Sequence, residues 1–149
     1  MKLAILLLLP LAAPGGKQAG TAPEDLAHIQ AEPRPDKRAH LALDYADGAL
    51  KQAREAYDKG DNPGVSTFLD EVQQSVKLAQ TSLQQTGKNP SRSPKHFKYA
   101  ELKTRDLLRK LETFREAMSV TDRPVVDQAI AAVQKIHDAL LDGIMGKTK

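Results

Sequence analysis

The chain has 149 residues, and its 22 Lys and Arg against 19 Asp and Glu give a formal net charge of +3. That length suits a single domain with one hydrophobic core. Cysteine is absent, which excludes disulfides, a thiol nucleophile, thioether-bound haem and zinc sites built from cysteine. Hydrophobic residues make up 40% and charged residues 28% of the chain, a composition that predicts a folded protein rather than a disordered one.

Residues 1–20 have the layout of a secretory signal peptide. One basic residue, Lys2, precedes an apolar run from Leu3 to Ala13, and small and turn-forming residues follow, which is the order found in leaders of exported proteins. The run is about half as long as the ~20 residues that a membrane-spanning helix needs. We therefore expect the leader to be removed and the mature protein to be secreted, in a periplasmic or extracellular location, without a transmembrane span.

The next segment, residues 21–35, is polar and contains Pro23, Pro33 and Pro35 without any hydrophobic period. Such a composition predicts a flexible arm. The folded region is therefore expected to begin at Asp36, which would cap the first long helix.

Residues 36–146 are divided by prolines into long windows with helical periodicity. Within these windows, apolar residues recur at spacings of three and four, the pattern of helices that pack in a bundle. Gly60 and Gly87 stand where two helices are expected to end, since glycine readily adopts the left-handed conformation that follows a helix. The pattern predicts helices over 36–60, 62–87, 94–119 and 122–145.

The two halves of this region share a signature 61 residues apart, because residues 54–65 and 115–126 both read REA-x4-D-x-P-x-V. The match predicts two copies of one αα-hairpin, each burying its apolar face against the other. The expected fold is an all-α, antiparallel four-helix bundle built from this internal repeat. An open solenoid of two hairpins is the alternative.

Gly48 lies inside the first predicted long helix, among several alanines. Glycine there costs about 1 kcal/mol of helix stability relative to alanine. Close approach of a neighbouring helix would explain its presence, and a kink or small cavity is the competing explanation.

The histidines do not have the spacing of a metal site. His28, His40 and His96 lie far apart in the sequence, and neither H-x3-H nor Glu-x-x-His occurs, so no metal site is predicted. His137 differs, because it takes an apolar position in the last helix. It is predicted either to be a neutral histidine hydrogen-bonded to Thr104 or water, or to be the axial ligand of a haem or the contact to another small ligand.

The strongest concentration of charge lies between Lys88 and Lys110, where eight Lys or Arg and two acidic residues give a local net charge of +6. Such a cluster is typical of a surface for an anionic partner, here a membrane surface, an envelope polymer or an acidic protein. The alternative is a solvated face partly neutralised by nearby acids. The predicted contact residues are Arg92, Lys95, His96, Lys98 and Arg105. Nucleic acid is not predicted, because no recognition-helix or RNA-binding motif occurs.

No catalytic motif is present: the chain has no G-x-S-x-G, P-loop or G-x-G-x-x-G, and no enzyme is predicted. The leading hypothesis is a non-catalytic exported bundle that acts as a binding or structural module and needs no cofactor. Two alternatives to this hypothesis are a bundle that carries a haem or another small ligand through His137, and a helical protein–protein adaptor. Ile136, Leu141 and Met145 in the last helix motivate it, since together they would form an exposed apolar face.

Overall fold

The computed structural model of the chain describes residues 25–147, and within them it is entirely helical. A short first helix precedes the long ones: α1 (Leu26–Gln30), α2 (Pro35–Asp58), α3 (Asn62–Gln85), α4 (Lys95–Ala117) and α5 (Arg123–Ile144). The ends of α2 to α5 differ from the predicted ends by two residues at most. The leader predicted over residues 1–20 lies outside the described residues and stays a prediction, as does the 61-residue repeat.

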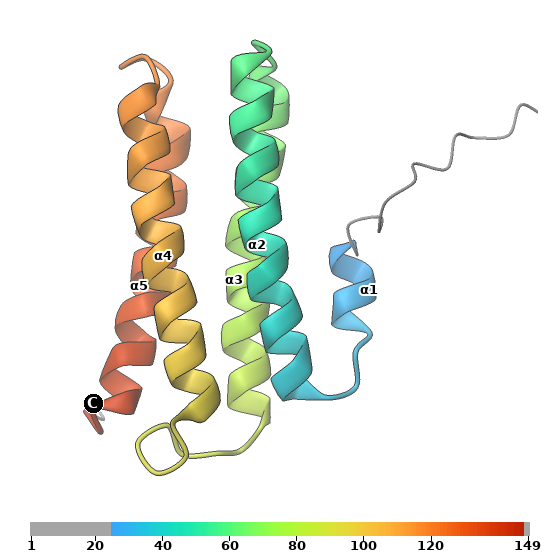
Figure 1. The fold of residues 1–149 in the computed structure, drawn as a ribbon, viewed down its shortest axis with the longest axis vertical. Coiled ribbons are helices and arrows are strands. Elements are labelled where there is room, and N and C mark those ends of the chain that lie inside the picture. The colour runs from blue at the N-terminus through green and yellow to red at the C-terminus, as the bar shows by residue number, and fades with distance from the viewer. Residues whose placement is uncertain (1–24, 148–149) are drawn as a thin grey trace, which may run out of the picture.

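The four long helices are arranged as two hairpins side by side, α2 with α3 and α4 with α5 (Figure 1). Across the hairpins, α2 packs against α4 and α3 packs against α5. Both hairpin turns lie at the upper end in Figure 1, and the connector of residues 86–94 lies at the lower end. The antiparallel arrangement therefore holds within each hairpin. Between hairpins the adjacent helices run parallel, because the connector leads from α3 to the diagonally opposite α4.

The apolar stripes of the long helices meet in a single core. Leu50, Leu69, Leu111 and Val133 are fully or almost fully buried there, one from each long helix. Burying an aliphatic side chain of this size contributes about 1.5–3 kcal/mol. The core thus explains why neither hairpin is expected to be stable alone, since each would expose its stripe.

The α2–α3 pair is the most closely packed of the helix pairs. Small residues form the contact, because the buried positions of α2 are mainly alanines and α3 contributes Ser75, Ala79 and Ser82. Ser75 is satisfied inside its own helix, where its Oγ donates to the Glu71 carbonyl at 2.6 Å. Small side chains let two helix backbones approach closely.

Gly48 does not take part in this packing. It is exposed on α2, and a Cβ at this position would meet no atom within 4 Å. The expected close approach of another helix at Gly48 is therefore wrong, because the tightly packed face of α2 is formed by its alanines instead.

Two helices end at the predicted glycines, but the first long helix does not begin with the predicted Asp36 cap. Gly60 and Gly87 have φ values of 73° and 67°, the left-handed conformation that follows a helix at low cost only in glycine. At the start of α2, however, Arg34 is the capping residue and Pro35 opens the helix. Proline at the first helical position needs no N–H partner, which moves the start of the helix before Asp36.

Part of the segment predicted as a flexible arm is helical and packed against the bundle. Residues 26–30 form α1, and its Ile29 is only 1% exposed because it packs into the core. Arg38 links the chain after α1 to α3, because its Nη1 donates to the Glu32 carbonyl at 2.6 Å and its Nε donates to Ser82 Oγ at 2.9 Å. A single buried isoleucine produces no periodicity, so the pattern could not reveal it.

The turns of the two hairpins are joined by hydrogen bonds. The Tyr57 hydroxyl accepts from the backbone N–H of Ser119 at 2.9 Å and donates to Asp122 Oδ2 at 3.1 Å. The Tyr57 ring also packs edge-on against Phe114. These contacts fix the hairpins to each other at the end opposite the connector.

Candidate functional site

The connector between the hairpins is an ordered loop held against the end of α5. Asn89 shapes it, because its side-chain Oδ1 accepts from the backbone N–H of Ser91 at 2.9 Å. Pro90 packs against α5 so closely that a Cβ on Gly143 would lie 3.3 Å from it. The basic side chains of this region are therefore presented from a fixed backbone.

Four cations of the basic run lie at this end of the bundle without an ion-pair partner among the described residues. All four are exposed. Two belong to the connector and two to the first turns of α4; we call them the basic end: Lys88, Arg92, Lys95 and Lys98. Three of the predicted contact residues, Arg92, Lys95 and Lys98, thus remain available to a partner.

The start of α4 adds to the positive potential of the basic end. Pro94 caps the helix without a side-chain hydrogen bond, and its first turn holds no acidic residue. A helix N-terminus carries about half a positive charge, and a cation placed there costs about 0.3–1 kcal/mol. Lys95 and Lys98 therefore stand where the helix itself disfavours them.

The rest of the basic run is neutralised by acidic residues. Arg109 pairs with Asp106, and the other pairs join Lys103 to Asp44 at 3.1 Å, Lys110 to Asp47 at 2.9 Å and Arg105 to Glu101 at 2.6 Å. Two of the acids come from α2, which packs beside α4. Arg105, the fourth predicted cationic contact, is thus already engaged within the protein.

His96, the remaining predicted contact residue, lies at the boundary between α4 and α2. Its Nδ1 is 3.1 Å from Nε2 of His40. The His40 ring stacks on Tyr99, with centroids 3.9 Å apart and planes 6° apart. This histidine pair was missed in the sequence because its members are 56 residues apart, and only the packing of α2 beside α4 brings them together.

The surroundings of the pair are charged on both helices. Asp44 on α2 accepts from the Tyr99 hydroxyl at 3.4 Å and from Lys103 at 3.1 Å. Burial lowers the pKa of His40, and the charge of protonated His96 lowers it further. His40 is therefore neutral over a wider range of pH than an exposed histidine.

His137 is buried and hydrogen-bonded, as one of its two interpretations predicted. Its Nδ1 lies 3.0 Å from Thr104 Oγ1, and its Nε2 lies 3.6 Å from Glu101 Oε1. These surroundings do not fit an axial haem ligand, because both ring nitrogens face protein groups. Thr104 is fully buried, so this hydroxyl is not placed to act as a nucleophile toward a substrate.

Glu101 is a buried carboxylate in the site, next to His137. It is one of the two acidic residues within the basic run of residues 88–110, and it is only 6% exposed. Arg105 compensates its charge through Nε at 3.0 Å, and His137 lies on its other side. A buried carboxylate needs such partners because desolvation of an unpaired charge is very costly. The position of Glu101 beside the core stripe of α4 was the available signal.

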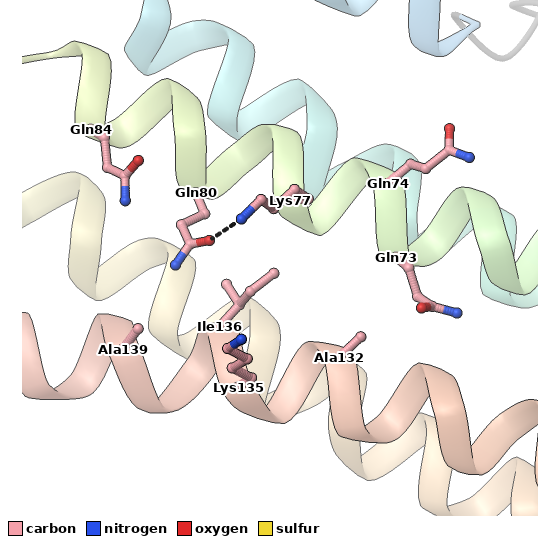
Figure 2. A pocket seen from close by; sticks show the side chains of 9 residues that line it. All are labelled: Gln73, Gln74, Lys77, Gln80, Gln84, Ala132, Lys135, Ile136 and Ala139. Carbon is pink, nitrogen blue, oxygen red and sulfur yellow. Dashed lines mark hydrogen bonds between the residues drawn. The ribbon is translucent and has the colours of Figure 1, made fainter.

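A groove of about 520 Å³ runs between α3 and α5 (Figure 2). Figure 2 shows Lys77 and Gln80 extending from α3 toward Ile136 of α5, with Lys77 Nζ donating to Gln80 Oε1 at 3.5 Å. The glutamine side chains form one wall and small side chains form the other: Gln73, Gln74, Gln80, Gln84, Ala132 and Ala139. The groove holds both hydrogen-bonding amides and apolar surface, and the ionisable side chains among its lining residues are Lys77 and Lys135.

The apolar face proposed for an adaptor is only partly exposed. Leu141 and Met145 are 37% and 57% exposed, whereas Ile136 is buried at 8%. Ile136 faces the α3–α5 groove, so the three side chains do not form one exposed apolar surface.

Comparisons with known proteins add no functional information. No family model matches the chain, and neither the search of curated proteins nor the search of solved structures found a significant match. Among residues 25–147, no helix has the combination of length and apolar character that crossing a membrane requires.

Proposed function

We propose that this protein is a non-catalytic exported helical bundle that binds anionic surfaces of the cell envelope through its basic end. The observation that carries the proposal is the separation of the basic run into two parts. Its later cations are paired with acids, whereas Lys88, Arg92, Lys95 and Lys98 form no ion pair among the described residues. Export rests on the leader predicted over residues 1–20.

Electrostatics supports an anion at this place. The four cations gather at one end of the bundle, where the uncapped start of α4 adds its own positive potential. Phosphate or carboxylate groups there would relieve the repulsion between the lysines and the helix terminus. Because the connector backbone is ordered, little conformational freedom would be lost on binding.

The binding partner is expected to be an extended surface rather than a single small ion. All four cations are exposed, and they are divided between the connector and the first turns of α4, an arrangement that an extended anionic surface can match. Each lysine near an anionic lipid surface contributes about 1 kcal/mol, and the attraction falls off within a Debye length. Binding should therefore weaken steeply as salt is added.

A charge-reversal experiment tests the proposal. Residues 21–149 are mixed with phosphatidylglycerol vesicles, with phosphatidylcholine vesicles and with polyphosphate, and binding is measured by co-sedimentation and fluorescence anisotropy. We expect binding to the two anionic partners only, and the Lys95→Glu/Lys98→Glu variant to bind at least about tenfold more weakly. Comparing binding to phosphatidylglycerol vesicles with binding to polyphosphate shows whether a lipid surface or a polymer is the preferred anionic partner.

The matched control reverses two exposed lysines away from the basic end, Lys51 and Lys135. This Lys51→Glu/Lys135→Glu variant has the same net charge as the test variant, so it removes the contribution of total charge alone. Equal weakening in the two variants, or binding of the wild type that salt does not change, would contradict the proposal.

A further inference from the structure

The His40–His96 pair is the only other place where we find that packing brings two chemically versatile side chains together at the surface of the described residues. Both histidines are half-buried, with an open side toward solvent. Their facing nitrogens, Nε2 of His40 and Nδ1 of His96, are 3.1 Å apart. The stack on Tyr99 fixes the plane of the His40 ring, so its nitrogen is held in direction as well as in place.

The separation of the two nitrogens matches that of two ligands on one metal ion. A Zn²⁺–N(imidazole) bond measures ~2.0–2.1 Å, which puts two tetrahedral nitrogen ligands about 3.3 Å apart. The observed 3.1 Å differs from this value by about 0.2 Å, which small side-chain rotations can supply. In the structure, the two nitrogens lie at hydrogen-bond distance.

The surroundings of His40 also favour its neutral form. A histidine ligates through a neutral imidazole, and burial followed by the charge of His96 lowers the pKa of His40. Asp36 and Asp44, on the same helix as His40, act in the opposite direction, while Lys103 of α4 adds to the lowering. Asp36 and Asp44 are themselves paired with Arg34 and Lys103, so their charge is largely offset by these cations.

We propose that His40 and His96 form a two-histidine binding site for a divalent transition-metal ion, with water molecules as the remaining ligands. Imidazole nitrogen favours Zn²⁺, Cu²⁺ and Ni²⁺ over Mg²⁺ and Ca²⁺. Among residues 25–147 no group of three His, Cys, Asp or Glu side chains is placed to hold a metal. The protein itself would therefore supply two ligands to the ion.

A metal at this site would link the two hairpins. His40 belongs to α2 and His96 to α4, and the two helices lie side by side (Figure 1). Because the unfolded chain does not hold the two imidazoles together, the ion would bind the folded state preferentially and raise the melting temperature.

The test uses Zn²⁺ as the probe, with residues 21–149 free of affinity tags. Isothermal titration at neutral pH measures the affinity of the wild type and of His40→Ala and His96→Ala. Changes in the outer shell of a metal site cost about 10–100-fold in affinity, so loss of a ligand should weaken binding by at least about tenfold. His28→Ala is the matched control, since His28 is exposed on α1 and belongs to no cluster.

A second measurement needs no variant and so does not depend on whether a variant folds. In a Zn²⁺ titration of the wild type followed by NMR, the imidazole signals of His40 and His96 should shift, while those of His28 and His137 stay unchanged. The proposal is overturned if the wild type shows no binding and no rise in melting temperature. It is also overturned if His28→Ala weakens binding as much as the pair variants do.

Discussion

Single residues in this protein take their roles from the face of the helix on which they lie. Thr104, His137 and Glu101 are polar, yet all three are buried and mutually satisfied, with Thr104 and His137 in contact at 3.0 Å. Gly48 is small, yet it faces solvent with open space around it. Residue type alone would place each of these four residues on the opposite side of its helix.

Gly48 provides a prediction at this scale. Gly48→Ala should raise the free energy of unfolding by about 1 kcal/mol, because alanine favours the helix and restricts the unfolded chain. The new methyl group meets nothing within 4 Å, so no steric cost offsets the gain. Urea denaturation followed by circular dichroism measures the change.

Gly60 is the control for Gly48. It also has open space around it, but its φ is +73°, so Gly60→Ala should destabilise the protein by about 1–2 kcal/mol. A loss of stability in Gly48→Ala as large as that in Gly60→Ala would show that Gly48 has a packing role after all.

At the scale of elements, α1 shows how one side chain can order a polar segment. Ile29 inserts into the core, while the Arg38 guanidinium joins the backbone after α1 to α3. Without Ile29, the remaining residues of α1 offer little apolar surface to bury, since the helix is only five residues long. An isolated helix of that length does not form in water.

Ile29→Ala should therefore lower the free energy of unfolding by about 2 kcal/mol or more, the usual cost of truncating a buried isoleucine. Gln30→Ala, an exposed change in the same helix, should remain within about 0.5 kcal/mol of the wild type. Chemical denaturation distinguishes the two. If residues 25–34 were a flexible arm, the variants would be equally stable.

At the scale of the whole molecule, stability should depend on the protonation of His40, because it lies between the hairpins. Its pKa is lowered in the folded state by burial and then by His96, so the unfolded chain takes up the proton at higher pH than the folded protein does. The free energy of unfolding should therefore fall as the pH drops below about 6.5 and through the folded-state pKa. Above that range the contribution is constant.

Denaturation of the wild type and His40→Gln across this pH range checks the prediction. Glutamine does not titrate, so the variant should lose the part of the pH dependence that belongs to His40 while keeping the part due to carboxylates. Identical pH profiles for the two proteins would show that protonation of His40 does not destabilise the folded state.

The positions of the long helices could be predicted because their determinants are local. Proline and glycine mark the ends, and the spacing of apolar residues identifies the buried face of each window. The same reasoning placed Thr104 beside His137 and identified three of the four cations of the basic end. Each of these conclusions depends on residues within one helix or on the antiparallel order of neighbours in a hairpin.

By itself, the sequence thus determined an all-helical chain, the limits of its four long helices and the location of its basic run. Tertiary structure decided that adjacent helices of the two hairpins run parallel and that α1 is ordered. It also decided that Glu101 is buried and that His40 contacts His96. It also decided which cations of the basic run have partners, since Asp44 and Asp47 reach Lys103 and Lys110 from α2. The reason is physical: helix periodicity fixes which face of each helix is buried, whereas pairing between helices depends on how the connector places the second hairpin against the first.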